Sequence, residues 1–428
     1  MNRENGDIRQ RGIPFLTALA VAVSAFCDIP AYFSVGGATG SAILTALTAG
    51  LGILSLPALI RAGSNSAVRP MLPFIIFTTW STFLFIVKGT GINGLQTISM
   101  LWAFLSIVLT TASFTTAESA AVVRRNIFRA GWAVGLLYSI VLLQSGIGGG
   151  GFIGRRSFAL EGLIIMAAAV PFVVERARSP RWLPGFLLIL ISASLSRTAL
   201  VVGAVLLAIR TSITKRGLRL ARLLFLGASA GAVLLWAISS IPELRDRFLG
   251  GDQAFSFFGL SISSQGRNNI WGVLLDGVGS SPIIGHGPGA IRVLISTLIP
   301  GEKEPHNDFL RALYDTGWVG MVMLVGAVLA LLIATGRRAL RADSPNTGAP
   351  HVGAFLALAA FVLGALTDNP IVYDFVMFPL AVIVGLSLRE SLPETIKEVK
   401  PRQDGLGNGQ RGGLRRVTAH IDTHLQNT

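Results

Sequence analysis

The side chains best suited to chemistry in this sequence are arginines and histidines that stand in short polar segments between apolar runs. Arg197 lies in a Ser-Arg-Thr segment, Arg267 begins Arg-Asn-Asn, His286 is flanked by glycines, and His306 stands in Glu-Pro-His-Asn-Asp. An arginine guanidinium stays charged and offers a planar fork that suits phosphate oxygens. Histidine is the usual proton-transfer group near neutral pH. These residue types indicate chemistry on an anionic, phosphate-bearing substrate.

Other sequence motifs of catalytic, phosphate-binding or metal-binding sites are either absent or unspecific here. Gly227–Gly231 matches the nucleophile-elbow string, but it lies inside an apolar run instead of a strand-turn-helix context. The sequence contains no phosphate-binding loop and no Asp-x-Asp pair. His286 and His306, with Glu304 and Asp308 nearby, could form a zinc site, but their spacing does not demand one. We therefore expect no metal and no cofactor.

The composition indicates a polytopic membrane protein. The chain has 428 residues, of which 51% are hydrophobic and only 14% are charged. Soluble domains carry about 25% charged residues, so this chain lacks the polar surface of a soluble enzyme or of a disordered protein. Cys27 is the single cysteine, which excludes an intrachain disulfide. The net charge is +14. In a membrane protein the distribution of positive charge between loops sets the orientation of the spans, so the total charge does not indicate nucleic acid, and we expect no nucleic-acid partner.

Hydropathy predicts an all-α fold with about 12 transmembrane helices. About 20 apolar residues cross a bilayer. The predicted spans are 14–34, 41–60, 70–87, 95–114, 128–145, 158–175, 182–196, 198–210, 221–239, 313–335, 352–367 and 371–388.

The distribution of positive charge decides how the run 182–210 is divided. With two short spans meeting near Arg197, both termini are cytoplasmic and the cytoplasmic segments hold 26 of the 36 Lys and Arg residues. A single long span would turn the basic clusters at 215–222 and 337–341 outward. The two-span arrangement places Arg197 near the outer surface, although an arginine that merely snorkels at a helix end remains the alternative.

The same topology gives one large extracytoplasmic loop, at about 240–312, between spans 9 and 10. A connection of this length is usually functional. Residues 1–399 form the predicted transmembrane domain. Residues 400–428 are predicted to be a disordered basic cytoplasmic tail that anionic membrane lipids attract. Arg155 and Arg156 stand among the polar groups on the same outer side.

The ordered set of polar segments resembles the O-antigen ligase and polysaccharide polymerase (Wzy-type) superfamily. The set comprises Ser196-Arg197-Thr198-Ala199, Gly266-Arg267 with Trp271, Pro282–Gly289, and His306–Leu310 followed by Asp315–Gly320. The resemblance covers a core at about 180–335. This chain departs from the family pattern in its short spans and in having Asp308 where a tyrosine is common.

The resemblance implies a metal-independent, inverting glycosyltransferase on the periplasmic face of a bacterial inner membrane. It would transfer a glycan from undecaprenyl diphosphate to an acceptor glycan lipid, either as a repeat-unit polymerase, which we favour, or as a ligase acting on lipid A-core. A flippase and a chain-length regulator are the expected protein partners. The main rival is a transporter or flippase, and a non-catalytic scaffold is a weaker one. Transporters place ionisable groups near the bilayer midplane, often in repeated halves, which this sequence does not show.

Residue roles follow from the resemblance. Arg197 and Arg267 would hold the diphosphate, and His306 would activate the acceptor hydroxyl. The accessory residues are His286, Asn307 and two further cations, Arg292 and Arg311. A structural role in a glycine-rich turn for His286, or at a helix start for His306, is the alternative in each case.

Overall fold

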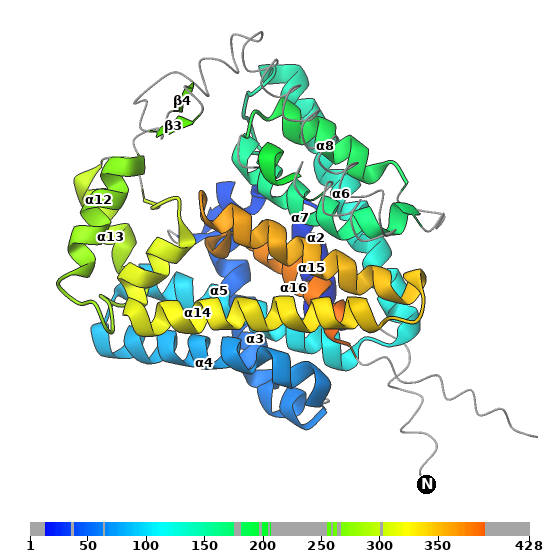
Figure 1. Ribbon diagram of the computed structural model, residues 1–428, viewed down its shortest axis with the longest axis horizontal. Helices are drawn as coiled ribbons and strands as arrows, with labels where there is room; N and C mark the ends of the chain where they lie inside the picture. Colours follow the sequence, from blue (N-terminus) through cyan, green and yellow to red (C-terminus); the bar gives the residue numbers. More distant parts are fainter. Residues whose placement is uncertain are drawn as a thin grey trace, which may run out of the picture. The chain divides into compact units, whose positions relative to one another are not determined.

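The computed structural model describes residues 13–35, 38–62, 65–174, 181–196, 199–203, 206, 255–257, 260–262, 267–299 and 303–389. The predicted span 221–239, most of the predicted span 198–210 and the predicted tail 400–428 therefore lie outside the described residues. Figure 1 shows the arrangement of the helices.

The described part of the chain is dominated by helices, as the hydropathy predicts. Its α-helices are α2 (Phe15–Ser24), α3 (Gly40–Ala62), α4 (Asn65–Lys88), α5 (Gly91–Phe114), α6 (Ala117–Ser145), α7 (Arg155–Val174), α8 (Leu183–Ala193), α12 (Arg267–Val278), α13 (Ala290–Leu298), α14 (Asp308–Arg341), α15 (Pro345–Ala365) and α16 (Asp374–Leu388). Two 3₁₀ turns, η2 (Ile29–Tyr32) and η3 (Pro370–Val372), precede α3 and α16.

Six of these helices are long and apolar enough to cross a membrane, namely α4, α5, α6, α7, α14 and α15. Four shorter apolar helices correspond to predicted spans 1, 2, 7 and 12. The first of them ends at Ser24, well before the predicted end at 34, because a turn and the Pro30-containing 3₁₀ turn interrupt the apolar run. The fold class is thus confirmed as helical with several candidate membrane spans, while the number twelve stays a prediction.

Two small hairpins accompany the helices and leave the all-α fold class unchanged. Strands β1 (Ser34–Val35) and β2 (Ala38–Thr39) pair antiparallel, as do β3 (Phe255–Phe257) and β4 (Leu260–Ile262). Strands of two or three residues are too short to show the alternating hydrophobic pattern on which strand prediction depends.

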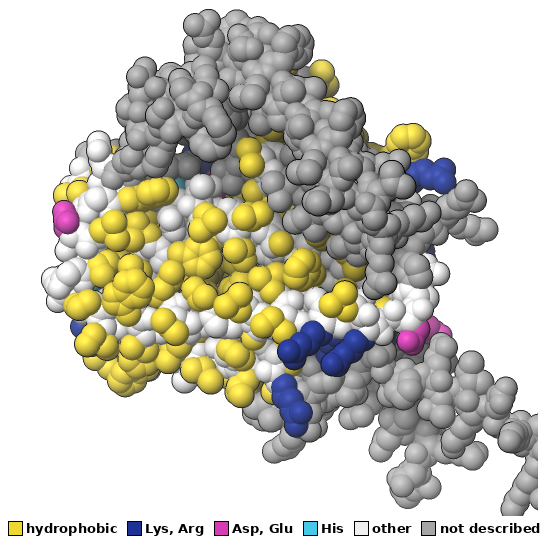
Figure 2. All heavy atoms as spheres, in the orientation of Figure 1, with side chains coloured by type: hydrophobic (Ala, Val, Ile, Leu, Met, Phe, Trp, Pro, Cys, Tyr) yellow, Lys and Arg dark blue, Asp and Glu magenta, His cyan; other side chains and the backbone are white. Residues whose placement is uncertain are grey.

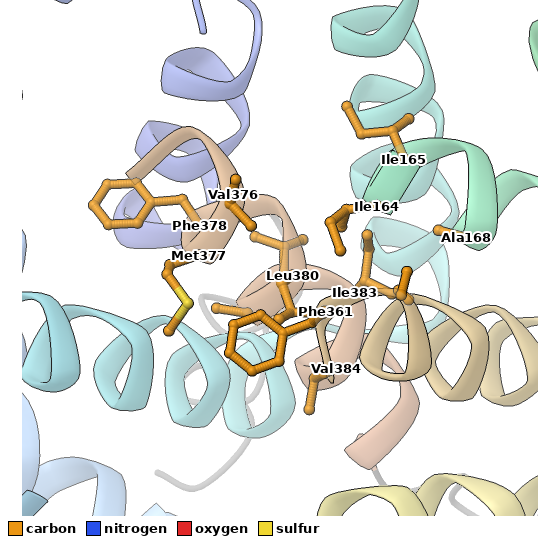
Figure 3. Packing of buried hydrophobic residues seen from close by; sticks show 14 of the residues in the cluster. Ile164, Ile165, Ala168, Phe361, Val376, Met377, Phe378, Leu380, Ile383 and Val384 are labelled. Carbon is orange, nitrogen blue, oxygen red and sulfur yellow. The ribbon is translucent and has the colours of Figure 1, made fainter. Parts of the chain in front are cut away.

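Helix α16 lies at the centre of the apolar core. Fourteen of its fifteen residues are buried, so it packs on all sides. Figure 3 shows Val376, Leu380 and Ile383 of α16 with Ile164 of α7 and Phe361 of α15 close by. A helix that is hydrophobic all round belongs inside a bundle. Because α16 begins at Asp374, its buried start fixes the position of the polar turn that precedes it.

Helices α4 and α14 present an apolar face outward. Exposed large hydrophobic residues recur along α14 at Trp318, Val322, Leu329 and Ile333, a helical spacing that keeps them on one face. Similar residues line α4, and Figure 2 shows hydrophobic side chains spread over this side of the molecule. An exposed apolar surface of this extent is typical of contact with lipid.

The segments that the charge pattern assigns to the outside meet at one end of the bundle. The Tyr32 hydroxyl donates to the Gly151 carbonyl at 3.0 Å, and the Ser41 hydroxyl to the Asp374 carboxylate at 2.6 Å. The Thr90 hydroxyl donates to the Pro288 carbonyl at 2.6 Å. The loops after α2, α4 and α6, the loop before α14 and the start of α16 therefore lie together. At the opposite end, Arg338 donates to the Ser387 carbonyl at 2.6 Å.

The chain reverses direction after α8. This helix ends at Ala193, a turn follows at Ser194 and Leu195, and residues 199–203 are helical again. A Cβ atom built on Gly203 would lie 3.5 Å from Leu188 of α8. In one continuous helix these two positions would be about 22 Å apart. The described residues thus show the reversal that the two-span prediction requires, next to Arg197, which itself lies outside them.

Cysteine labelling tests the orientation of this bundle. In a Cys27→Ala background, Gly150→Cys lies in the exposed loop after α6 and Asp343→Cys in the exposed turn before α15. We expect a membrane-impermeant maleimide to label Gly150→Cys in intact spheroplasts, and Asp343→Cys only after the membrane is opened. The reverse pattern would contradict the predicted orientation.

Candidate active site

His306 lies at the described end of the bundle where these loops meet, and three side chains surround its Nδ1 atom. The Asn369 amide nitrogen lies 3.0 Å from Nδ1, and Arg156 Nη1 lies 3.3 Å from it. The Asp368 carboxylate lies 3.7 Å from Nδ1 and 3.5 Å from Nε of Arg156. The cluster joins the start of α7, the segment before α14 and the turn after α15.

The backbone around His306 is unusual. Its φ angle is 54°, in the left-handed region that histidine tolerates better than most residues but that still costs energy. The next residue, Asn307, caps α14, because its side chain accepts a hydrogen bond from the Leu310 N–H at 3.0 Å. Asp308 then accepts from the Ile371 N–H at 2.8 Å, which ties the start of α14 to η3. These contacts hold a strained, buried histidine in one place.

Helix α14 is broken at Gly317, and the break receives the segment 282–287. Gly317 has φ 66° and ψ −173°, and a Cβ atom there would lie 2.2 Å from the Ile283 carbonyl oxygen. The Trp318 N–H donates to the Pro282 carbonyl at 2.8 Å, and the Gly287 N–H to the Asp315 carbonyl at 2.8 Å. Only glycine fits this crossing. The backbone of the first turns of α14 therefore binds the loop 282–287 through these hydrogen bonds.

The buried carboxylate of Asp315 fixes the start of α13. Its two oxygens accept from the Gly289 N–H at 2.9 Å and from the Ile291 N–H at 3.0 Å. Gly289 has a φ of 79°, and a Cβ atom there would lie 2.4 Å from the backbone of Asn93. A carboxylate at a helix N-terminus satisfies N–H groups that lack partners within the helix.

Arg292 and Arg311, predicted as further cations, are both paired with Glu304. The Arg292 Nε–H donates to Glu304 Oε1 at 2.7 Å, and its Nη1–H donates to Gln96 at 2.6 Å. Arg311 is almost fully buried and forms ion pairs with Glu304 and with Asp308. These guanidiniums join α13, α14 and α5. We therefore assign both arginines a structural role in the site and no role in substrate binding.

His286 also has a structural setting. Its ring stacks on Tyr314 with a centroid distance of 4.4 Å, and its Nε2 lies 3.1 Å from the Gly277 carbonyl oxygen. A carbonyl oxygen only accepts, so Nε2 carries the proton and donates. His286 therefore links α12 to α14 across the glycine-rich turn, which is the alternative that the sequence left open.

Of the two predicted diphosphate ligands, the structure describes the backbone of one. Arg267 begins α12, and Arg197 lies outside the described residues. Helix α12 is attached to the residue before His306, because the Trp271 indole N–H donates to the Pro305 carbonyl at 2.8 Å. An apolar cleft of about 350 Å³ opens between α12 and α13. Its lining is Asn269, Ile270, Val273, Leu274, Ile295, Leu298 and Ile299.

Sequence reasoning missed two members of the cluster and gave a third no role. Asp368 and Asn369 form the polar turn between two apolar helices, and Arg156 was grouped with other outer polar residues only. The available signal was the Asp-Asn-Pro turn, a short polar interruption between the predicted spans 11 and 12. Nothing in the sequence joins it to His306, which lies 63 residues from Asn369 along the chain.

Comparison with known proteins bears on the segment that carries most of these residues. Residues 182–325 match the family model described as O-Antigen ligase. Over these residues the chain is similar to the O-antigen ligase family. This match confirms the predicted resemblance to the O-antigen ligase superfamily. A comparison with curated proteins finds no match.

The matched segment includes Arg197, Arg267, His286 and His306. Arg156, Asp368 and Asn369 lie outside it, on α7 and on the turn after α15. His306 of the matched segment therefore contacts side chains from outside that segment. Among the described residues, no group of three or more His, Cys, Asp or Glu side chains is placed to hold a metal ion.

Glu304 is expected to be a main stabilising residue of the loop. Glu304→Ala leaves two buried guanidiniums without their shared carboxylate, and breaking a buried ion pair costs about 3–5 kcal/mol. We expect a lower temperature of thermal unfolding in detergent, with little change for the matched control Lys303→Ala next to it. Equal stability of the two variants would show that the ion pairs do not hold α13 on α14.

Proposed function

We propose that the protein is an inner-membrane glycosyltransferase that takes a glycan from undecaprenyl diphosphate and joins it to a sugar hydroxyl of an acceptor glycan lipid. The site faces the periplasm, and both termini lie in the cytoplasm. The acceptor is most simply another carrier-linked repeat unit, which makes the protein a polysaccharide polymerase. A ligase that uses lipid A-core is the alternative within the same family.

One observation carries this proposal. A buried histidine of the segment that matches the O-antigen ligase family model lies beside a partly exposed arginine, at the end of the bundle where the predicted outer loops meet. Ionisable groups spread through the middle of the bundle would favour a transporter. In the described part of the chain, the cluster of arginine, histidine and aspartate lies instead at helix ends.

The chemistry of a lipid diphosphate suits these residues. A diphosphate is a good leaving group once its charge is neutralised, and fixed guanidiniums supply that neutralisation by electrostatic stabilisation. Arg197 and Arg267 are the proposed ligands of the diphosphate, and His306 is the side chain at the reacting groups. No metal ion is required in this scheme.

The apolar cleft between α12 and α13 supports a donor with a hydrocarbon tail. Helix α12 begins at Arg267, and Asn269 and Ile270 in its first turn already line the cleft. One ligand with an anionic head and an apolar chain would satisfy both features. A soluble sugar nucleotide would leave the apolar lining without a partner.

The two arginines can be tested by a change that keeps their charge. Arg197→Lys and Arg267→Lys retain a cation but lose the bidentate fork, so we expect each to lose most glycan synthesis in a complementation assay. Chelation with EDTA should leave transfer by the purified protein intact. Full glycan synthesis by both lysine variants would exclude the proposed bidentate binding of the diphosphate by these two guanidiniums.

The two histidines should behave differently. We expect His306→Ala to abolish glycan transfer while the protein still inserts and still binds the carrier lipid. His286→Ala removes a stacking partner of Tyr314 and should keep partial activity. Unchanged transfer by purified His306→Ala would remove His306 from the reaction.

A further inference from the structure

Two helices that lie side by side, α4 and α14, show where the hydrocarbon of a membrane would end (Figure 1). In α4, the charged residues Arg69 and Lys88 enclose eighteen residues without a charge. In α14, Trp318 and Arg337 enclose an uncharged stretch of the same length. At a rise of about 1.5 Å per residue each stretch spans about 28 Å, close to the roughly 30 Å of a bilayer's hydrocarbon core. Lysine and tryptophan side chains are frequent at the membrane surface, so Lys88 and Trp318 mark the boundary on the predicted outer side.

The loop 282–287 lies between these two boundary residues. A Cβ atom built on Gly287 would lie 2.7 Å from Cβ of Lys88 at the end of α4. The Trp318 N–H donates to the Pro282 carbonyl at 2.8 Å, next to the break in α14. The loop is thus held at the depth where the hydrocarbon ends.

The loop adds exposed apolar side chains at this depth. Ile283 is 65% exposed and Ile284 is 39% exposed. We call the exposed apolar residues at this end the outer rim, which comprises Ile86 and Val87 of α4, Ile92 of α5, Ile283 and Ile284 of the loop, and Trp318 of α14. Figure 2 shows hydrophobic side chains that continue from α4 and α14 to the end of the molecule where α12 and α13 lie. The apolar surface therefore does not stop at the two boundary residues.

The backbone of the loop also suits a membrane surface. Non-helical backbone is tolerated at membrane depth where protein groups satisfy its N–H and carbonyl groups. Pro282 has no N–H to satisfy. The Ile283 carbonyl accepts from the Val319 N–H at 3.2 Å. The His286 N–H donates to the Tyr314 carbonyl at 3.0 Å. Helix α14 thus satisfies these groups of the loop without water.

We propose that the loop 282–287 is docked in the outer leaflet of the membrane, with Ile283 and Ile284 in contact with lipid acyl chains. The predicted topology places the whole connection 240–312 outside the bilayer, and this inference moves one part of it to the membrane surface. The loop leads into α13 and is bonded to the first turns of α14, so its docking fixes the depth of both. The inference goes beyond the proposed function and holds whichever reaction the site performs.

Lipid is the occupant that the surroundings favour. The outer rim is continuous with the exposed apolar residues of α4 and α14, which suit contact with lipid. A second copy of the chain or a protein partner would have to cover the loop while leaving these helix faces to lipid. Neither Ile283 nor Ile284 offers a polar side-chain group that would orient a protein partner.

Spin labels at single cysteines test the depth of the loop. Full-length protein in a Cys27→Ala background carries Ile283→Cys or Ile284→Cys, in nanodiscs of phosphatidylethanolamine and phosphatidylglycerol. Val322→Cys, on the exposed apolar face of α14, is the control for lipid, and Asp276→Cys, exposed on α12, is the control for water. Oxygen concentrates among acyl chains and a nickel chelate stays in water, so the ratio of their collision rates with the label reports its depth. We expect the ratio at both loop positions to be severalfold above that at Asp276→Cys and close to that at Val322→Cys.

Two results would overturn the proposal. A ratio as low as that at Asp276→Cys would place the loop in water. Slow collisions with both reagents would show that protein covers the outer rim. Thermal unfolding of each labelled variant identifies misfolding, and the two loop positions are measured separately, so either folded variant decides the proposal. The measurement does not depend on glycan transfer, so its failure and a failure of the proposed function are distinguishable.

Discussion

The site depends on two buried carboxylates in the first turns of α14. Asp308 accepts a hydrogen bond from the turn after α15, and Asp315 accepts two from the start of α13. Buried charged groups are stable only when hydrogen bonds or opposite charges satisfy them. Each carboxylate therefore fixes one neighbouring segment, and His306, immediately before α14, is held between these segments.

The apolar bundle and the polar site constrain each other. Helix α16 is buried along almost its whole length, so the turn that precedes it cannot shift without disturbing the core. That turn carries Asp368 and Asn369, which meet His306 and Arg156. The outward apolar faces of α4 and α14 suit contact with lipid. The bundle thus places a small set of polar groups at one end of its helices.

Much of the helical framework could be predicted because membrane spans depend on local hydrophobicity. The sequence also predicts the reversal after α8 from charge alone, and the contact between Gly203 and Leu188 agrees with it. The break at Gly317 was not predicted, because a glycine inside an apolar run has no local signature. Its necessity comes from the crossing by Ile283, a contact between distant parts of the chain.

Only part of the site could be predicted, because local sequence patterns identify residue types but not contacts between distant parts of the chain. His306 was identifiable from its residue type and from the motif around it, both of which are local. Arg292 and Arg311 have the same residue type as the proposed phosphate ligands, and only the folded chain shows that Glu304 pairs with both. The contact of Asp368 and Asn369 with His306 could not be predicted from the sequence. It depends on the packing of α16 against α7 and α15, which places the turn that carries these two residues next to the histidine.

The proposed reaction breaks the bond between a glycan and a lipid diphosphate. It can be tested by the stoichiometry of the reaction of the purified full-length protein in nanodiscs with a carrier-linked glycan labelled in both its lipid and its sugar. We expect one free carrier diphosphate for every new glycosidic bond, in the presence of EDTA, with inverted configuration at C1. Carrier that stays linked to its glycan in every condition, while the labelled lipid crosses a sealed bilayer, would contradict it and identify a transporter.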